Sequence, residues 1–400
     1  MNVTVMLAAA LLSYGPWEST GPEGGQVKAL LQSGQDPGVL FALSGSSPSQ
    51  VVRSQDGGSS WETISEIQYC NPYDMVMTAD GRLLVLGSSR TWTSTDGGYT
   101  WNETYISNTI FYNGAAHPTE TGTVYAAGYK YDGSSWNMSF FSTTDCGSSW
   151  TDVPLVVSPN TSYGRCVAVS GSSPDHILVG GYEYQSGYFP CLFKSEDGGS
   201  TFFEVTPAAA NYYFSGAAFH PTNPDIILAG DLTVVFRSTD GGSTWSNAGS
   251  LTYSYDISFS DADHDLVMSA GLNRTYRSID AGQSWTTVTA GLSGDGINWI
   301  VPDAVSTSTA YTGSSAGFFH SDDGGQSWTP QNSGLVLGKA MAMEQVNGWV
   351  FMNMQDMGLW KAEDGPSIIW EEVTTPLTCG DFCALESVGP DTLLALEGGG

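Results

Sequence analysis

The sequence predicts an all-β protein built from repeated four-stranded units. Three observations lead to this prediction. An eight-residue motif recurs along the chain at nearly even spacing, strand-like runs of alternating apolar and polar residues flank each copy, and no stretch shows the sustained 3.6-residue apolar period of a helix. Forty-nine glycines among 400 residues are consistent with the many turns that such a fold requires.

The repeated motif has the form Ser-x-Asp-Gly-Gly-x-Ser/Thr-Trp and is clearest at 238–245. An Asp carboxylate can accept backbone N–H groups across a tight turn, and a Gly pair supplies the positive φ that the reversal requires. The aromatic residue then opens the next strand, where it can be buried between sheets. We therefore interpret the motif aspartates as architectural. There are seven full copies and a decayed eighth, centred on Asp56, Asp96, Asp145, Asp197, Asp240, Asp280, Asp323 and Asp364.

The spacing of the motif indicates the architecture. Successive motif aspartates lie 40, 49, 52, 43, 40, 43 and 41 positions apart, which is the period of one four-stranded propeller blade. Strand-like runs at 382–385 and 392–396 predict half of a further blade, which a strand at 17–20 could complete by circular closure; a truncated C-terminus is the alternative. We predict a β-propeller of four-stranded antiparallel blades, about eight in number, with eight or nine left open.

The motif resembles the Asp box, or BNR repeat, of sialidases, sortilin-like receptors, xyloglucan-hydrolysing enzymes and photosystem II assembly-factor-like propellers. The resemblance covers residues 22–375 and implies a repeat propeller of the broad kind that includes WD40- and YVTN-like repeats. It does not select an activity, because unrelated functions share this scaffold.

Composition restricts the partners and the location. Only 12 Lys and Arg stand against 41 Asp and Glu, a formal net charge of −29, so nucleic acid and anionic membrane surfaces are excluded as partners. Residues 1–15 contain an apolar run too short to span a bilayer, which predicts a signal peptide; because the run lacks a basic residue before it, an ordinary buried strand is the alternative. We expect one propeller over residues 16–400 that is secreted, periplasmic or on the cell surface, is monomeric, and does not insert into a membrane.

The chain contains six cysteines and five histidines, and neither set has the spacing of a metal site. We therefore predict no metal and no cofactor. An even number of cysteines is compatible with disulfides in an oxidising compartment, although the pairing is left open, with free buried thiols as the alternative. The cysteines are Cys70, Cys146, Cys166, Cys191, Cys379 and Cys383.

Two lengthened hairpins, at 128–136 and 181–189, account for the long spacings of 49 and 52. Strand alternation places them at the blade ends opposite the Asp boxes, side by side on the face where propellers usually bind ligands. Aromatic rings with polar tips can stack on sugars or anchor a protein partner. The alternative is that the hairpins pack on each other. The predicted ligand-binding residues are Tyr129, Tyr131, Trp136, Tyr182, Tyr184, Tyr188 and Phe189.

The sequence gives weak support for catalysis. A sialidase would need an arginine triad, but Arg53, Arg237 and Arg277 directly precede Asp boxes, at the wrong end of the strands. A xyloglucanase-like enzyme would need two opposed carboxylates in a cleft, and enzymes of that kind generally use two facing propellers, whereas one is evident here. Glu183 and Asp132, inside the aromatic hairpins, are the candidate carboxylates. We expect a non-enzymatic binding or scaffolding module for a carbohydrate or protein ligand. The alternatives are a glycoside hydrolase acting on a neutral polysaccharide and a structural repeat of a larger surface protein.

Overall fold

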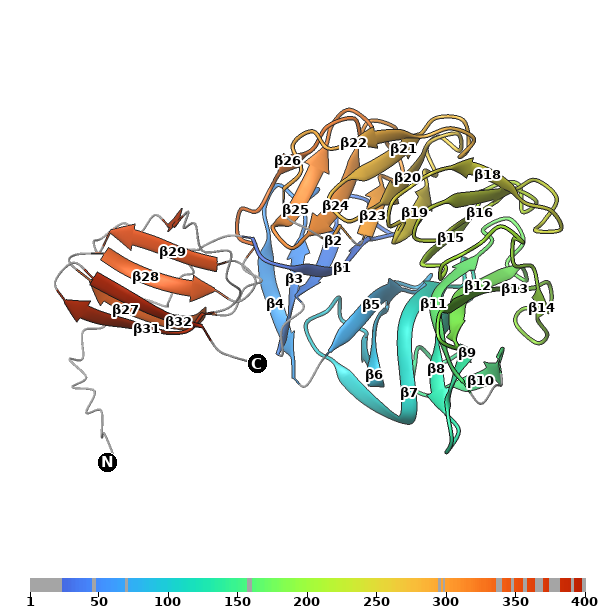
Figure 1. The fold of residues 1–400 in the computed structure, drawn as a ribbon, viewed down its shortest axis with the longest axis horizontal. Helices are drawn as coiled ribbons and strands as arrows, with labels where there is room; N and C mark the ends of the chain where they lie inside the picture. The colour runs from blue at the N-terminus through green and yellow to red at the C-terminus, as the bar shows by residue number, and fades with distance from the viewer. Residues whose placement is uncertain are drawn as a thin grey trace.

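The computed structural model describes residues 24–44, 48–68, 71–156, 160–293, 296–297, 299–335, 340–346, 349–354, 358–363, 370–373, 382–389 and 392–397. In these ranges the chain is made of strands and turns, and no helix is present that could cross a membrane. Figure 1 shows a ring of sheets running from blue β1 to orange β26, with the red strands β27–β32 outside it. The predicted signal peptide, the strand at 17–20 and the decayed turn at Asp364 lie outside the described residues.

The ring contains six sheets whose strands are antiparallel and follow chain order. The first comprises β1 (Val27–Gln32), β2 (Leu40–Ser44), β3 (Ser49–Ser54) and β4 (Glu62–Ile67). The second has six strands: β5 (Pro72–Met77), β6 (Leu83–Ser94), β7 (Asn102–Ala116), β8 (Val124–Tyr131), β9 (Trp136–Thr143) and β10 (Thr151–Pro154). The third comprises β11 (Thr161–Val169), β12 (Ile177–Tyr184), β13 (Tyr188–Ser195) and β14 (Phe203–Glu204).

The remaining ring sheets have shorter strands. The fourth comprises β15 (Gly216–Phe219), β16 (Ile227–Gly230), β17 (Val235–Ser238) and β18 (Ser246–Gly249). The fifth comprises β19 (Asp256–Phe259), β20 (Val267–Ala270), β21 (Thr275–Ser278) and β22 (Thr286–Val288). The sixth comprises β23 (Trp299–Pro302), β24 (Ala310–Ser314), β25 (Gly317–Ser321) and β26 (Thr329–Pro330). Outside the ring are β27 (Ala340–Val346), β28 (Trp349–Met354), β29 (Gly358–Glu363), β30 (Glu371–Glu372), β31 (Phe382–Gly389) and β32 (Thr392–Glu397).

The all-β propeller of four-stranded antiparallel blades is confirmed, but the predicted count of about eight is wrong: the described part of the chain forms six blades. Two sequence repeats share the six-stranded sheet, because β7 continues for 15 residues and pairs first with β6 and then with β8. The eighth repeat forms the separate sheet β27–β30, and the predicted half-blade forms the hairpin β31–β32. Local repeats therefore form as predicted, but their grouping into sheets differs.

The ring closes between its first and sixth sheets. Phe318 on β25 packs edge-to-face on Trp61, with ring centroids 4.9 Å apart, and both side chains are buried. The indole N–H of Trp299 on β23 donates to the carbonyl oxygen of Lys28 on β1. These contacts join segments from the two ends of the ring, so the closure depends on tertiary packing and not on any local motif.

The Asp boxes share one hydrogen-bond pattern. At Asp240, Oδ1 accepts the N–H of Thr244 at 2.8 Å, Oδ2 accepts the hydroxyl of Thr244 at 2.6 Å, and the hydroxyl of Ser238 donates to Oδ1 at 2.9 Å. At Asp197 the hydroxyl and N–H of the equivalent Thr201 hold the pKa of the carboxyl down at about 2. The same three contacts recur at Asp56, Asp96, Asp145, Asp197, Asp280 and Asp323.

Basic side chains that precede three Asp boxes reach the next blade. Lys194 Nζ, Arg237 Nε and Arg277 Nε each donate to the carbonyl oxygen of the residue that follows the Asp in the next box, at 2.8, 2.9 and 2.6 Å. The contact occupies the same place in each repeat, so it links neighbouring blades. This explains why Arg237 and Arg277 stand directly before Asp boxes, and it gives them a structural role.

Candidate functional site

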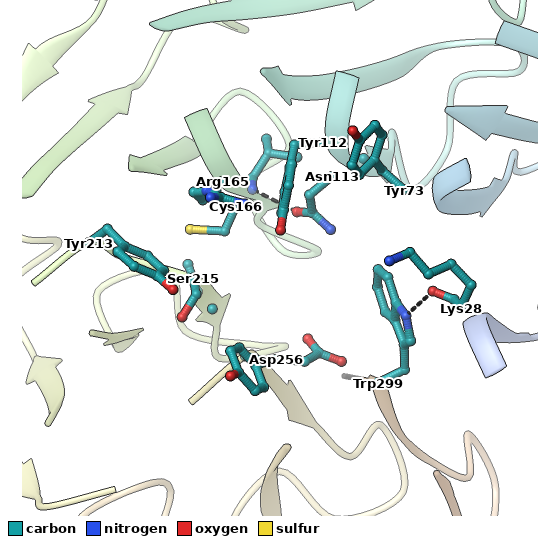
Figure 2. Close-up of a pocket in the computed structure, with 15 residues that line it drawn as sticks. Lys28, Tyr73, Tyr112, Asn113, Arg165, Cys166, Tyr213, Ser215, Asp256 and Trp299 are labelled. Atoms are coloured by element: carbon teal, nitrogen blue, oxygen red, sulfur yellow. Dashed lines mark hydrogen bonds between the residues drawn. The ribbon is translucent and has the colours of Figure 1, made fainter. Parts of the chain in front are cut away.

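The inner strands of the ring begin around a cavity of about 270 Å³ (Figure 2). Residues at or beside the starts of β1, β5, β15, β19 and β23, from the middle of β11 and from the second half of β7 line it. We call it the hub cavity because every inner strand contributes to its wall. Aromatic rings and a few polar groups dominate the lining, chiefly Tyr73, Tyr112, Tyr213, Tyr255 and Trp299 together with Lys28, Asn113, Arg165, Ser215 and Asp256.

Polar side chains around the hub cavity link three of the inner strands to the next one. Asp74 Oδ2 accepts the N–H of Gly114 at 2.7 Å, Asn113 Oδ1 accepts an N–H of β11 at 2.8 Å, and Asp256 Oδ2 accepts an N–H of β23 at 3.1 Å. Each acceptor lies near the cavity end of its own inner strand, and each donor belongs to the following inner strand. These side chains therefore hold the centre of the ring together.

Burial perturbs both carboxyls in this wall. Desolvation raises the pKa of Asp74 to about 8 and that of Asp256 to about 6, against the opposing effect of the backbone N–H groups that each accepts. Perturbed carboxyls often mark functional sites, but here the hydrogen bonds to the next inner strand assign them a structural role. Sequence reasoning missed both residues. The available signal was the repeated Tyr-Asp pair, Tyr73-Asp74 and Tyr255-Asp256, at the start of an inner strand.

Arg165 lies between the hub cavity and the aromatic hairpins. Its guanidinium carbon is 4.1 Å from the ring centroid of Tyr112, 5.4 Å from that of Tyr213 and 5.8 Å from that of Tyr182. Such cation–π contacts are worth about 0.5–2 kcal/mol each, depending on desolvation. Among the described residues no carboxylate lies within ion-pair distance of Arg165, and its buried Nε has no hydrogen-bond partner. Aromatic rings therefore surround its charge in place of an acid.

The two aromatic hairpins, β8–β9 and β12–β13, are joined through a residue that the sequence did not single out. The ring of Tyr163 on β11 lies 4.8 Å from that of Tyr129 and 4.9 Å from that of Tyr182. Trp136 lies 5.4 Å from both Tyr129 and Tyr131. The hairpins therefore lie in one aromatic cluster, and part of that cluster is packing between them.

The exposed part of the cluster is smaller than the predicted set. Tyr131, Tyr184, Tyr188 and Phe189 are 36%, 51%, 44% and 50% exposed, and we call these four residues the aromatic surface. Tyr182, at 7% exposure, packs between Tyr163, Tyr188 and Tyr213 and supports that surface from below. Tyr129 and Trp136 are half-buried. Sequence reasoning identified the hairpins correctly but could not distinguish the exposed rings from the supporting ones.

The two carboxylates considered for catalysis are both engaged in their own loops. Asp132 accepts the N–H groups of Ser135 and Ser134, which hold its pKa at about 2. Glu183 accepts the side-chain amides of Asn160 at 3.1 Å and Gln185 at 2.7 Å. A general acid needs a pKa near the working pH, so Asp132 is unsuited to that role. Neither residue gains support as a catalytic group.

Three of the six cysteines, Cys146, Cys166 and Cys191, have free thiols in the structure. Cys166 and Cys191 lie on β11 and β13, and the intervening strand β12 separates them. Burial raises the pKa of the Cys166 and Cys191 thiols to about 12, so both are inert at neutral pH. Cys70, Cys379 and the side chain of Cys383 fall outside the described part, and their pairing stays open.

Comparisons with known proteins agree on the fold. No model of a known protein family matches the chain. A xyloglucanase of Acetivibrio thermocellus is 26% identical over 251 residues, which are 49% of this chain and 28% of that protein. An ancestral GH74 enzyme aligns with 97% of this chain at a TM-score of 0.73 and 14% identity, and the GH74 xyloglucanase from Xanthomonas campestris with 86% at a TM-score of 0.64 and 13% identity.

The chain spans 60% of each of those two enzyme structures and 28% of the A. thermocellus protein. A structure of YCF48 bound to D1 peptide aligns with 78% of this chain and 96% of its own, at a TM-score of 0.53 and 14% identity. At these identities the likeness to solved structures shows the fold alone. The chain is thus a β-propeller that shares its architecture with xyloglucanase and YCF48 propellers, as its Asp boxes predicted.

Proposed function

We propose that this propeller is the glycan-binding part of a carbohydrate-active protein of the glycoside-hydrolase type, acting on a neutral polysaccharide. The observation that carries the proposal is the aromatic surface, in which four exposed rings lie on two adjacent hairpins over a layer of supporting tyrosines. The partial identity to a xyloglucanase supports the choice of a glycan over a protein ligand. This proposal replaces the non-enzymatic module that the sequence motifs favoured.

The chemistry of the aromatic surface suits a neutral sugar chain. A pyranose ring presents C–H groups on its faces, which pack on flat aromatic rings, while tyrosine hydroxyls can bond to sugar hydroxyls at the edge. Tyr184 and Tyr188 keep their exposed positions because Tyr188 packs against Tyr182 and Tyr213 beneath it, with centroids 5.1 and 5.5 Å apart. The formal charge of −29 would repel a polyanionic polymer. A neutral polysaccharide therefore fits this surface best.

Hydrolysis would require two carboxyl groups placed about 5–10 Å apart across the scissile bond. In the described ring, Asp132 and Glu183 are held by their loops, while Asp74 and Asp256 bond to the next inner strand. We therefore assign the ring the binding role and leave the carboxyl pair to other parts of the protein. We also propose that the protein is exported and acts as a monomer, in keeping with the apolar run at 1–15 and the low content of basic residues.

The test compares a double variant, Tyr184→Ala/Tyr188→Ala, with the parent protein and with Tyr99→Ala. Tyr99 is a matched control because it is 49% exposed and lies in an Asp box, at the opposite end of the blades. Affinity electrophoresis on xyloglucan and mixed-linkage glucan measures binding, and a reducing-end assay measures hydrolysis. Losing two stacking contacts of about 0.5–1.5 kcal/mol each predicts roughly 5- to 150-fold weaker binding.

The outcomes separate the two parts of the proposal. Binding that is lost in the double variant and kept in Tyr99→Ala supports the aromatic surface, and product release shows that this protein hydrolyses the bound glycan. Binding without product restricts the function to glycan recognition. If neither polysaccharide is retained by the folded parent protein, the glycan proposal is wrong and a protein ligand becomes the better hypothesis.

A further inference from the structure

Cations are scarce in this protein, and most of those in the ring are already used. The chain has 12 Lys and Arg against 41 Asp and Glu. Four basic side chains of the ring pair with carboxylates. Arg237 and Arg277 bond to a backbone carbonyl of the next blade. Arg165 also has no carboxylate of the described chain within ion-pair distance, and it differs from Arg237 and Arg277 because its guanidinium lies among tyrosine rings in the wall of the hub cavity.

The half-buried guanidinium of Arg165 faces a cavity and has aromatic neighbours in place of an acidic partner. The contacts with Tyr112 and Tyr213 stabilise the charge in part. They leave the donors of Arg165 incompletely used, since its Nε is buried and has no hydrogen-bond partner. Arginine binds carboxylates through two parallel N–H groups, so a carboxylate is the group that would complete this environment.

The hub cavity supplies a second cation and the walls of a binding site. Figure 2 shows Lys28 on the side of the cavity opposite Arg165, with the end of its side chain beside the indole of Trp299. Tyr73 and Tyr255 add flat faces with hydroxyl tips to the lining. The cavity volume of about 270 Å³ is below the range of drug-sized pockets and limits the occupant to about one sugar ring.

The charges around the cavity also limit the occupant to one negative charge. Asp256 stands in the same wall as the two cations, and the protein as a whole carries a formal charge of −29. A phosphate monoester, with nearly two charges, would meet this field less favourably than a carboxylate. A neutral sugar would leave Arg165 without its acidic partner.

We propose that the hub cavity binds a single sugar bearing one carboxylate, of the hexuronic acid class, with the carboxylate on Arg165 and the sugar ring against the aromatic walls. Lys28 faces the ligand from the opposite side and raises the local positive potential. The site is separate from the aromatic surface. The choice of a sugar over other ring-bearing carboxylates rests on the proposed function.

Isothermal titration calorimetry with the full chain tests the site, using D-glucuronate as the probe. Glucose is the neutral comparison, glucose 6-phosphate the doubly charged one and benzoate the non-sugar carboxylate. Trp299 fluorescence offers a second readout inside the cavity. We expect saturable binding of glucuronate, at least tenfold tighter than any of the three comparison ligands.

The variants are Arg165→Gln and Lys28→Gln, with Arg90→Gln as the matched control. Arg90 is an exposed arginine that pairs with Glu103 away from the cavity, so its loss should not change binding. Arg165→Gln should weaken glucuronate binding at least tenfold. Should that variant fail to fold, Lys28→Gln still tests the cavity, because the backbone carbonyl of residue 28 continues to accept the indole N–H of Trp299. Lys28→Gln should weaken glucuronate binding and make that binding less sensitive to salt.

Four results would overturn the proposal: no glucuronate binding by the folded parent protein, equal binding of glucose, tighter binding of the phosphate ester or benzoate, or binding by folded Arg165→Gln equal to that of the parent. Failure here is distinguishable from failure of the glycan proposal. A Tyr184→Ala/Phe189→Ala protein, which leaves the contact of Tyr188 with Tyr213 in place, should keep its glucuronate affinity, while the Lys28→Gln protein should keep its retention on xyloglucan.

Discussion

Asp74 provides a direct test of how the centre of the ring is held. The carboxyl is 3% exposed, its Oδ2 accepts the N–H of Gly114 at 2.7 Å, and its Oδ1 accepts the N–H of Met75 at 2.7 Å. Burial raises its pKa to about 8, with the nearby charge of Asp256 contributing. We predict that Asp74→Asn changes the free energy of unfolding in opposite directions at pH 4 and at pH 7.

The sign follows from proton linkage. The folded-state pKa lies above the unfolded-state value near 4, so the folded protein keeps a proton that the unfolded chain releases between about pH 4 and pH 8. The free energy of unfolding is then highest below pH 4 and falls with rising pH by up to about 1.4 kcal/mol per unit. At pH 7, about three units above the unfolded-state value, the cost reaches about 4 kcal/mol as an upper bound.

Asparagine cannot ionise, so the variant escapes this cost. Both oxygens of Asp74 act as acceptors, however, and an amide nitrogen in place of one of them forfeits a hydrogen bond worth about 1–3 kcal/mol when buried. The variant should therefore be less stable than the parent by about 1–3 kcal/mol at pH 4 and more stable by a similar amount at pH 7.

Calorimetric melting temperatures from pH 4 to pH 8 measure the effect, since about 1 kcal/mol corresponds to roughly 2–4 °C in domains of 150–250 residues. The two curves of melting temperature against pH should cross. Ser215→Ala is the control, because the hydroxyl of Ser215 donates to the carbonyl oxygen of Ser254 at 2.7 Å, takes no part in the hydrogen bonds of Asp74 and carries no proton to lose in this pH range; its deficit should be the same at every pH. Parallel curves for Asp74→Asn and the parent would refute the reasoning.

Three further changes test the rest of the structure. Phe318→Ala removes a fully buried ring that packs on Trp61 where the ring closes and should lower the free energy of unfolding by about 3–5 kcal/mol, read as a lower melting temperature; a loss under about 1 kcal/mol would argue against closure there. Asp197 has a pKa of about 2 in the folded protein, so its ionised carboxylate stabilises the fold above pH 4 and this stabilisation is lost as the pH falls towards 2. The denaturant midpoint of Asp197→Asn should therefore be below that of the parent at pH 6 and equal to it near pH 2. A difference between the two midpoints that stays constant with pH would contradict this. A Cβ on Gly181 would lie 1.9 Å from the carbonyl oxygen of Tyr163, so Gly181→Ala should speed hydrogen exchange in β11 and β12, which unchanged protection would disprove.

The all-β propeller could be predicted because Asp-box chemistry is local. Asp240, its glycine pair and Thr244 determine the turn within a few residues, and the motif spacing gives the blade period. The number of blades depends on how the repeats pair into sheets and where the ring closes, and the sequence of a single repeat determines neither. The chain continues through β7 without a break between two repeats, and closure relies on the contact of Phe318 with Trp61. The eighth repeat has the same order of four strands as the others and still lies outside the ring.

The aromatic hairpins were visible in the sequence because their insertions lengthened the repeat. The residues that connect them to the centre were not, since Tyr163 and Arg165 on β11 and Tyr213 before β15 are single positions that meet only when the sheets close into a ring. The choice of Asp132 and Glu183 as candidate acids shows the opposite limitation. Their position among aromatic residues was evident in the sequence. The hydrogen bonds that they accept from neighbouring N–H groups form only in the folded loops.

The distribution of linking side chains explains why a ligand site would develop at one part of the hub. Asp74, Asn113 and Asp256 each accept an N–H from the next inner strand, and the indole of Trp299 on β23 donates to a carbonyl oxygen of β1. At the corresponding positions on β11 and β15 the chain has Cys and Gly, which offer no such acceptor. Between β11 and β15 the inner wall lacks an acceptor side chain of this kind, and Arg165 lies there near Tyr112 and Tyr213. A hub held elsewhere by fixed hydrogen bonds can present this side as a preformed site.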